Sequence, residues 1–390
     1  MPKARVNGVD LYYEFDGPEG APFIVFSNSL GAALAMWDGV VARLAARYRC
    51  LRYDTRGHGR SGSADVAVTI DDLAADLAGL LDAVGVERAH IVGLSLGGMT
   101  GQALSLNQPA RVLSLTLIAT AAYLPPADFW NARATLVRKE GTAPVVDMLI
   151  PRWFTAPFRE NEKDLIERTR RDLLEVERFG YARCCEAIGG MDLRSRIPAI
   201  SAPTLAIAGA EDPVTTPAML EEIRSLVPGT ELVVLPRAAH LCSVECPDVV
   251  AAHIGLFIDE LEGRPAAGAA FAAGLVNRRK VLGTEHVERS LASAGEVGMP
   301  WQDFITRFAW NEIWGDPALP HKTRSLLTLA MMIALHREEE FKLHIRPALK
   351  NGVTVAELAA LIRQAAVYGG VPAGNAAMRW ARDVLGDDFR

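Results

Sequence analysis

A serine placed between glycines carries the clearest chemical signal in this 390-residue chain. The segment 93–97 reads Gly-Leu-Ser-Leu-Gly and follows an apolar run at 89–92. A serine at a tight strand-to-helix turn is held in a strained backbone conformation that exposes its hydroxyl at the edge of a sheet. Glycine is needed on either side because a side chain would clash in so tight a turn. The segment therefore predicts Ser95 as a nucleophile.

A serine nucleophile needs a base and a group that orients the base. Asp212 and His240 each follow a later run of apolar, β-branched residues, so both are expected at the carboxyl edge of the same sheet as Ser95. The chain order Ser, Asp, His is the order used by α/β-hydrolases. Glu211 is the nearby alternative for the acid. The sequence predicts a triad of Ser95, Asp212 and His240.

The elements that must position this triad alternate in kind along the first part of the chain. Short apolar runs typical of buried strands alternate with a stretch of helical periodicity at 71–84, which predicts a mostly parallel sheet. The region 122–195 has helical patterning without clear strands, and we expect it to form a cap over the active site. The expected strands are 23–26, 51–53, 90–92, 115–118, 204–208 and 231–235.

An oxyanion hole is expected beside the nucleophile. One donor is the backbone N–H of Leu96, the residue after the nucleophile. The second donor should come from the segment 28–31 after the first buried strand, and we assign it to the N–H of Leu30. Each such donor is worth about 3 kcal/mol of transition-state stabilisation.

Four segments carry a closer resemblance: Ser-Asn-Ser-Leu-Gly at 27–31, Ala-Met-Trp-Asp at 35–38, Arg-Tyr-Asp-Thr-Arg-Gly-His-Gly-Arg-Ser at 52–61 and Gly-Leu-Ser-Leu-Gly-Gly-Met-Thr-Gly-Gln at 93–102. They resemble the 3-oxoadipate enol-lactonases, which are α/β-hydrolases, and the resemblance spans roughly residues 5–260. It implies a small enol-lactone substrate that bears an acetate side chain. It also implies structural rather than catalytic roles for Arg56 and His58.

The carboxylate of such a substrate needs a cationic or polar partner. Arg133, Arg138 and Arg152 in the expected cap are candidates, and Trp130 and Trp153 could form apolar walls. We assign substrate binding to Trp130 and Arg133.

The composition changes near residue 262, where small residues suggest a flexible connector. We therefore expect a hydrolase domain at 1–262, a linker at 263–273 and a second domain at 274–390. The second domain shows no strand signal. A long apolar helix is expected at 323–336, and Thr354 with Glu357 forms a capping box for another. The fold class is thus an α/β-hydrolase followed by an all-α domain.

Six segments of the second domain carry a resemblance: Val-Leu-Gly at 281–283, His-Val at 286–287, Lys-Thr-Arg-Ser-Leu-Leu-Thr-Leu-Ala at 322–330, Arg-Glu-Glu-Glu-Phe-Lys-Leu-His at 337–344, Ala-Leu-Lys-Asn-Gly-Val-Thr at 348–354 and Tyr-Gly-Gly-Val-Pro-Ala-Gly-Asn at 368–375. Together they resemble the 4-carboxymuconolactone decarboxylase family, a helical fold related to alkylhydroperoxidase D, over roughly residues 275–385. No cysteine follows residue 246, so the thiol peroxidase chemistry of that superfamily is excluded.

Acid–base residues in this domain have helical spacing. His336, Glu340 and His344 would share one face if their helix is continuous, and such a set could also bind a metal. The resemblance implies a decarboxylase without cofactor, so we expect no metal. We assign proton transfer to Glu340 and His344, and carboxylate binding to Arg324 or Arg337.

The two resemblances imply consecutive reactions. Decarboxylation of 4-carboxymuconolactone yields 3-oxoadipate enol-lactone, which the hydrolase would open to 3-oxoadipate. The sequence thus predicts a bifunctional enzyme of protocatechuate catabolism. Two alternatives remain: an esterase, lactonase or cofactor-free perhydrolase with a helical oligomerisation domain, and a non-catalytic interaction module.

The composition indicates which classes of partner and which cellular compartment to expect. The formal net charge is −6 and no basic run is present, which argues against nucleic acid. No signal-peptide pattern or membrane-length apolar run is found. The odd number of cysteines, five, fits a reducing compartment such as the cytoplasm. The apolar C-terminal helices predict a homo-oligomer assembled through the second domain.

Overall fold

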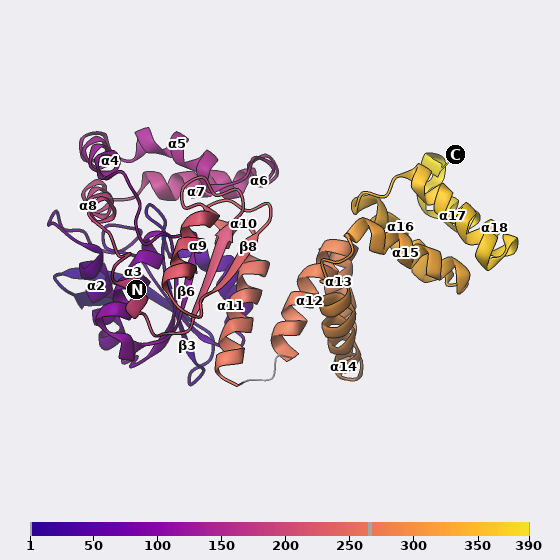
Figure 1. Cartoon of the computed structure of the whole chain (residues 1–390), viewed down its shortest axis with the longest axis horizontal. Coiled ribbons are helices and arrows are strands. Elements are labelled where there is room, and N and C mark those ends of the chain that lie inside the picture. Colours follow the sequence, from indigo (N-terminus) through magenta and orange to yellow (C-terminus); the bar gives the residue numbers. More distant parts are fainter. Residues whose placement is uncertain (1, 264–266, 390) are drawn as a thin grey trace. The chain divides into compact units, whose positions relative to one another are not determined.

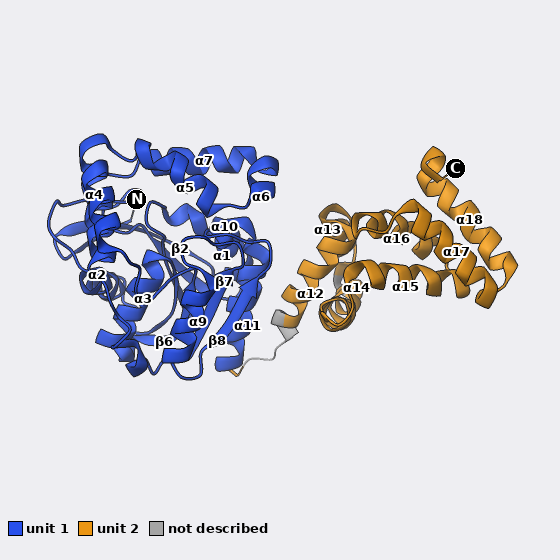
Figure 2. Cartoon of the chain, turned by 45° about the horizontal axis from the view of Figure 1, so that its top comes forward, with its two compact units in different colours: residues 1–262 blue, residues 263–390 orange. Residues whose placement is uncertain are grey.

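The computed structural model describes residues 2–263 and 267–389. The chain separates into two compact units, Met1–Glu262 and Gly263–Arg390, shown in different colours in Figure 2. Their hydrophobic cores are also separate: one large cluster fills the first unit, and two smaller clusters lie in the second. None of the described helices is both long enough and apolar enough to cross a membrane.

An eight-stranded sheet forms the centre of the first unit, in the order β1-β2-β4-β3-β5-β6-β7-β8. The pairs from β4 to β8 are parallel, whereas β1 pairs with β2, and β2 with β4, in antiparallel fashion. The six expected strands are present, and β1 and β2 are additional. The strands are β1 (Lys3–Val6), β2 (Val9–Asp16), β3 (Phe23–Ser27), β4 (Arg49–Tyr53), β5 (Ala89–Leu94), β6 (Val112–Ile118), β7 (Thr204–Gly209) and β8 (Glu231–Leu235).

Helices cover the sheet and leave its central strands with no exposed face. Every residue of β5 and of β7 is buried, as expected for parallel strands with helices on both sides. Helix α1 packs on α11, and α2 packs on α3 (Figure 2). The helical segments outside the cap are η1 (Leu34–Trp37), α1 (Asp38–Leu44), α2 (Ile70–Ala83), α3 (Leu96–Asn107), η2 (Pro109–Arg111), η3 (Ile197–Ala199), α9 (Pro217–Leu226), α10 (Cys242–Glu245) and α11 (Pro247–Leu261).

A helical insertion between β6 and β7 forms the cap (Figure 1). Its two ends meet where the N–H of Leu193 donates to the carbonyl of Ala122 at 2.8 Å. The cap contacts the core closely: a Cβ on Gly57 would lie 2.4 Å from the Cα of Gly180. The cap helices are α4 (Ala127–Glu140), α5 (Ala143–Trp153), α6 (Ala156–Asn161), α7 (Lys163–Leu174) and α8 (Arg178–Gly189).

The described residues of the second unit form helices and turns. The capping box at Thr354 is present at the start of α17. The helices are α12 (Ala267–Leu282), α13 (Thr284–Ala292), α14 (Gly295–Ile305), the π-helical segment η4 (Thr306–Ile313), α15 (His321–Ala334), α16 (Glu338–Lys350), α17 (Val355–Gly369), α18 (Val371–Leu385) and η5 (Gly386–Phe389).

Two features of the second unit differ from the sequence analysis. Helix α12 begins at Ala267, inside the segment expected to be a linker, because alanine favours helix more than any other residue. The helix expected at 323–336 ends at Ala334, and His336 has a φ of 55° in the turn before α16. His336 therefore does not lie on one helical face with Glu340 and His344.

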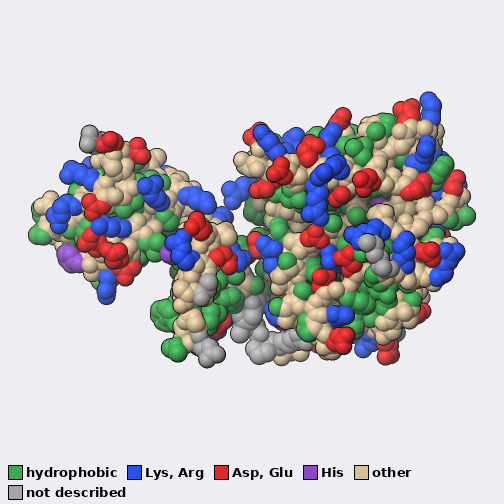
Figure 3. All heavy atoms as spheres, turned by 180° about the vertical axis from the view of Figure 1, so that it is seen from behind, with side chains coloured by type: hydrophobic (Ala, Val, Ile, Leu, Met, Phe, Trp, Pro, Cys, Tyr) green, Lys and Arg blue, Asp and Glu red, His purple; other side chains and the backbone are tan. Residues whose placement is uncertain are grey.

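Exposed apolar side chains distinguish the second unit. Figure 3 shows them at its surface in green. Trp301, Phe304 and Phe308 form an aromatic row whose rings stack with centroids 5.7 and 5.8 Å apart. These side chains are 60, 49 and 49% exposed. Surface patches of this kind mark contact sites for another molecule.

Candidate functional sites

Ser95 lies in the turn between β5 and α3 with a φ of 56° and a ψ of −113°. Its neighbours must be glycine: a Cβ on Gly93 would lie 2.2 Å from the carbonyl oxygen of Gly97, and one on Gly97 would lie 2.1 Å from that of Ser27. Hydrogen bonds hold the strained turn, since the N–H of Ser95 donates to Ile118 at 2.9 Å. The backbone is that of a nucleophile elbow.

Asp212 and His240 form a buried pair at the carboxyl ends of β7 and β8. His240 Nδ1 lies 2.9 Å from Asp212 Oδ2, and the two side chains are 2 and 0% exposed. The other oxygen, Oδ1, accepts the N–H groups of Val214 at 2.7 Å and Thr215 at 3.1 Å. Burial raises the pKa of Asp212, but the charge and hydrogen bond of His240, with these donors, hold it below its ordinary value. Glu211 is exposed, and Asp212 is the carboxylate on the histidine.

Thr215 joins both members of this pair. Its hydroxyl donates to Asp212 Oδ2 at 2.8 Å and lies 3.2 Å from His240 Nδ1. The side chain is fully buried. Within the described residues, Ser95 Oγ makes no hydrogen bond to His240. Such bonds in α/β-hydrolases often tighten only when substrate is bound.

The two amides expected to form the oxyanion hole have no acceptor among the described residues. Leu96 opens α3, where the first N–H groups of a helix lack internal partners. Leu30 lies in a loop that His58 holds in place, because His58 Nε2 accepts the N–H of the next residue, Gly31, at 2.9 Å. His58 Nδ1 lies 3.1 Å from the carbonyl of Arg56, which assigns the ring proton to Nδ1. Burial lowers the pKa of His58 to about 4, so the ring is neutral at pH 7.

Other polar residues near this loop are structural. Asn28 Nδ2 donates to the carbonyl of Tyr53, and Asn28 Oδ1 accepts the indole N–H of Trp37, each at 2.9 Å. Arg56 forms a buried ion pair with Asp76. Both arrangements hold the loop.

One carboxylate anchors both the histidine loop and the cap. Glu245 Oε2 accepts the N–H of Ala239 at 2.8 Å, next to His240. Its Oε1 accepts the N–H of Thr155 at 3.0 Å, in the cap. The position of the base is therefore coupled to the cap through Glu245.

The cap candidates differ sharply in their surroundings. Arg138 is ion-paired with Glu186 at 2.8 Å, and Arg152 is exposed. Arg133 is buried beside Trp130 and has no carboxylate partner among the described residues. Trp153 is also buried, and its ring lies close to Gly31: a Cβ there would be 3.4 Å from it.

In the second unit, α16 carries both acid–base candidates. Glu340 is exposed and His344 is half-buried. Burial and, to a lesser extent, the nearby His286 lower the pKa of His344 to about 4, and Glu340 acts in the opposite direction. The ring of His344 makes no hydrogen bond to a described residue. Three groups that can exchange protons thus lie close together here.

The two arginines predicted to bind carboxylate in the second unit differ. Arg324 donates to the carbonyls of Leu319 at 3.1 Å and Asp316 at 2.7 Å, so part of its guanidinium is occupied by its own loop. Arg337 is exposed at the start of α16. Within residues 2–263 and 267–389, no cluster of His, Cys, Asp or Glu is arranged to bind a metal.

Four residues near these sites were not assigned a role from the sequence. Thr215 follows Asp212 by three positions, a spacing at which a hydroxyl can reach back to the carboxylate. Tyr181, Glu245 and His286 reach their sites through tertiary packing, and no local pattern marks them.

Comparison with known proteins gives a match in each unit. Residues 22–245 match the alpha/beta hydrolase fold family, and residues 300–383 match the carboxymuconolactone decarboxylase family. The chain is 40% identical to 3-oxoadipate enol-lactonase 1 of Acinetobacter baylyi over 242 residues, which is 62% of this chain and 90% of the relative. It is 48% identical to 4-carboxymuconolactone decarboxylase of the same organism over 114 residues, or 29% of this chain and 85% of the relative.

A solved structure supports the fold of the first unit. The enol-lactonase from Burkholderia xenovorans LB400 matches with a TM-score of 0.65 and 40% identity, covering 66% of this chain and 99% of that one. Both resemblances inferred from the sequence are confirmed. The chain belongs to the α/β-hydrolase family through its first unit and to the carboxymuconolactone decarboxylase family through its second.

Proposed function

We propose that this protein is a bifunctional enzyme of protocatechuate catabolism. The second unit decarboxylates 4-carboxymuconolactone to 3-oxoadipate enol-lactone, and the first unit opens this lactone to 3-oxoadipate. The observation that carries the proposal is that one chain matches an enol-lactonase and a carboxymuconolactone decarboxylase at 40 and 48% identity. The product of the decarboxylation in the second unit is the substrate of the lactonase in the first unit.

In the first unit, Ser95 Oγ attacks the lactone carbonyl while His240 takes its proton. The N–H groups of Leu30 and Leu96 donate hydrogen bonds to the carbonyl oxygen as negative charge develops on it. The ring C–O bond then breaks, and the leaving enolate is protonated by His240 and becomes the ketone. Water hydrolyses the acyl-serine by the same route. Asp212 holds the imidazole and stabilises its charged form.

In the second unit, loss of CO2 from the γ-carbon leaves an electron pair that delocalises into the lactone ring. A proton must then be added at the α-carbon. We assign this proton transfer to His344 and Glu340, and carboxylate binding to Arg324 or Arg337. With a pKa of about 4, His344 is neutral in the free enzyme. A bound dianionic substrate raises the pKa of His344 and so favours the protonated form.

The partners of the chain are carboxylated lactones and a second copy of itself. The exposed aromatic row on α14 and η4 supports assembly through the second unit. All five cysteines are unpaired thiols, which supports a cytoplasmic location.

The test follows CO2 and lactone together when wild type and Ser95→Ala act on 4-carboxymuconolactone. Both proteins should release CO2 at the same rate, and only wild type should form 3-oxoadipate. The variant should accumulate enol-lactone. Absence of CO2 from wild type would leave the second unit as an assembly domain, which is the alternative function.

A further inference from the structure

The nucleophile and the base of the first unit are almost closed off from solvent, since Ser95 is 6% and His240 is 2% exposed. When a serine attacks a linear ester, the alcohol departs and water can take its place beside the acyl carbon. Opening a lactone releases no fragment, because the new ketone stays joined to the acyl carbon through the carbon chain. The water that hydrolyses the acyl-serine must therefore come from a place that the substrate does not fill.

A cavity of about 180 Å³ lies between the cap and the core, next to the catalytic loops. Gly31, which follows the oxyanion donor Leu30 in the chain, is part of its wall. Leu241, which follows the base His240, is another part. The wall is fixed here, because the N–H of Leu241 donates to the carbonyl of Trp153 in the cap at 3.0 Å. One water needs roughly 10–15 Å³, so the cavity has room for several.

Two hydroxyl-bearing side chains line this cavity among the described residues, and their hydrogen bonding differs. Thr169, on the cap helix α7, donates its hydroxyl to the carbonyl of Leu165 at 2.9 Å. Ser243, on α10, is fully buried, and its Oγ has no hydrogen-bond partner among the described residues. A buried polar group that lacks a protein partner is typically satisfied by a buried water. Ser243 is therefore the hydroxyl on the cavity wall that can hold a water.

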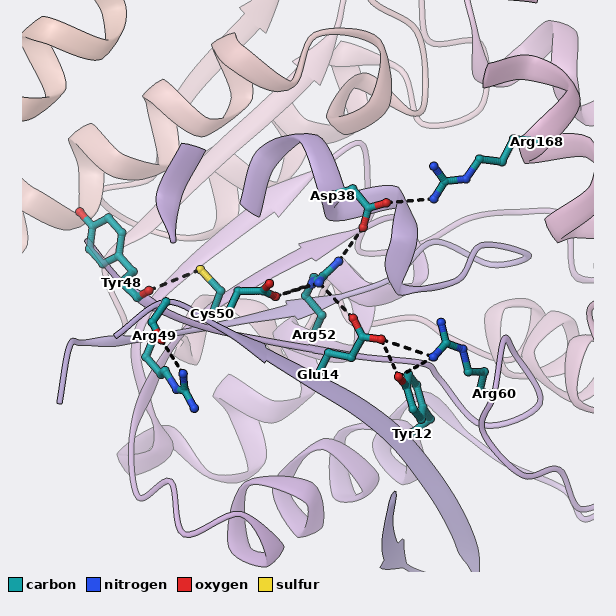
Figure 4. Close-up of polar contacts among 11 residues, drawn as sticks. Tyr12, Glu14, Asp38, Tyr48, Arg49, Cys50, Arg52, Arg60 and Arg168 are labelled. Carbon is teal, nitrogen blue, oxygen red and sulfur yellow. Dashed lines mark hydrogen bonds and ion pairs between the residues drawn. The ribbon is translucent and has the colours of Figure 1, made fainter. Parts of the chain in front are cut away.

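The charged side chains on the cavity wall favour a neutral molecule over an anionic lactone. They are Asp38, Arg168 and Asp172, so two carboxylates face one cation. Figure 4 shows that this cation is already paired: Asp38 accepts hydrogen bonds from Arg168 at 2.9 Å and from Arg52 of the core at 2.6 Å. Among the described residues of the wall, no unpaired cation is left to bind the carboxylate of a lactone.

We propose that this cavity supplies the water that hydrolyses the acyl-serine, and that Ser243 holds this water beside the catalytic loops. The inference rests on the proposed lactonase function. In this step the water oxygen attacks the acyl carbon while His240 takes one proton of the water. The bond from the acyl carbon to Ser95 Oγ then breaks, and His240 returns the proton to that oxygen, which leaves the new carboxylic acid. Ser243 is a positioning residue, because it acts on the water and not on the acyl group.

The experiment separates acylation from hydrolysis of the acyl-serine in Ser243→Ala. Loss of one hydrogen bond to the water should lower kcat for the enol-lactone about five- to tenfold. KM should fall by the same factor and kcat/KM should stay within about twofold of wild type, because only the step after acylation is slowed. Intact-mass spectrometry after an acid quench should show an adduct with the mass of one whole lactone. Thr169→Val, which removes the paired hydroxyl from the same cavity, is the matched control and should behave as wild type.

Two further measurements test the route of the water. p-Nitrophenyl acetate loses its alcohol on acylation, so Ser243→Ala should hydrolyse the resulting acetyl-serine at the wild-type rate. Ala35→Leu adds bulk to the cavity wall from η1 and should slow hydrolysis of the lactone adduct as Ser243→Ala does.

The proposal is overturned if Ser243→Ala accumulates no more lactone adduct than wild type. It is also overturned if kcat/KM for the lactone falls as far as kcat, or if hydrolysis of the acetyl-serine slows by the same factor. If wild type does not open the enol-lactone, the proposed function of the first unit has failed instead.

Discussion

A histidine in each unit has its pKa lowered to about 4 by burial, yet the two are used differently. His58 in the first unit is 1% exposed, and both of its ring nitrogens are hydrogen-bonded to backbone groups, the N–H of Gly31 and the carbonyl of Arg56. His344 in the second unit is half-buried, and its ring nitrogens have no partner among the described residues. The lowered pKa alone therefore does not distinguish the proposed catalytic histidine from a structural one, whereas the hydrogen bonds of the ring nitrogens do distinguish the two.

The two candidate sites also differ in how far they are exposed to solvent. The first unit closes its site with its own cap, and its nucleophile, base and acid are each less than 10% exposed. In the second unit, the proposed proton-transfer residues are exposed or half-buried, and many apolar side chains are exposed on the same unit. On the proposed function, the first unit acts as a single chain, whereas the second unit assembles with another copy. Four measurements test this difference between the units.

The largest effect is expected at the aromatic row. Replacing Trp301, Phe304 and Phe308 by glutamine should dissociate the oligomer, measured by light scattering after size exclusion. A symmetric contact between two copies buries these three side chains from each copy. The substitutions would remove all six, each of which contributes about 1 kcal/mol of burial. The matched control replaces the exposed Phe129 and Phe179 of the first unit and should leave the mass unchanged. A monomeric wild type would contradict the subunit interpretation.

His344→Ala should lower decarboxylation by about 10³-fold, or roughly 4 kcal/mol, because it removes a group that transfers the proton. Opening of enol-lactone by the same variant should be unaffected. His336→Asn is the matched control, since that histidine lies in the turn before α16 and asparagine tolerates its positive φ. Equal loss in both variants, measured as CO2 release, would remove the distinction between the two histidines.

His58 should make the first unit acid-sensitive. Its pKa is about 4 when folded and near 6.5 when unfolded, so the unfolded state binds the proton more readily. The stabilisation is fully present above pH 6.5 and is lost as the pH falls toward 4, to a total of roughly 3 kcal/mol. The free energy of unfolding of the first unit, measured with a chemical denaturant, should therefore fall as the pH is lowered over this range in wild type. It should fall less in His58→Gln. Identical pH slopes for the two proteins would show that the ring is not held neutral.

The smallest effect is expected at Thr215, a positioning residue for the triad. Thr215→Val removes one hydrogen bond from Asp212 and should lower kcat/KM for the lactone about tenfold. The pKa of Asp212 should rise, because its charged form loses a hydrogen bond. Thr215→Ser keeps the hydroxyl and should restore the rate. An equal loss of kcat/KM in Thr215→Val and Thr215→Ser would indicate a merely structural role.

The residues predicted from the sequence for the first site each belong to a local pattern. The glycines around Ser95 are required by the turn itself, and Asp212 and His240 each follow a strand at the same sheet edge. Tyr181 could not be found in this way. It reaches Gly31 only because Gly180 packs against Gly57, a contact between segments more than a hundred residues apart.

The second unit was harder to predict in detail because helical periodicity does not show where a helix ends. The hydrophobic pattern continues through Leu335, although the chain turns at His336. Similarly, strands β1 and β2 were missed because they pair antiparallel at the edge of the sheet, and β2 is half-buried over much of its length.

The dual role of Glu245 bears on how this enzyme could be redesigned. Caps of hydrolases are attractive modules for exchange, since they recognise substrate while the core supplies the chemistry. Here the carboxylate of Glu245 accepts hydrogen bonds from both the N–H of Thr155 in the cap and the N–H of Ala239 in the core. A transplanted cap that does not satisfy Glu245 at that point would disturb the base as well as the binding pocket. A chimera should therefore keep Thr155 and Glu245 together and vary the cap elsewhere.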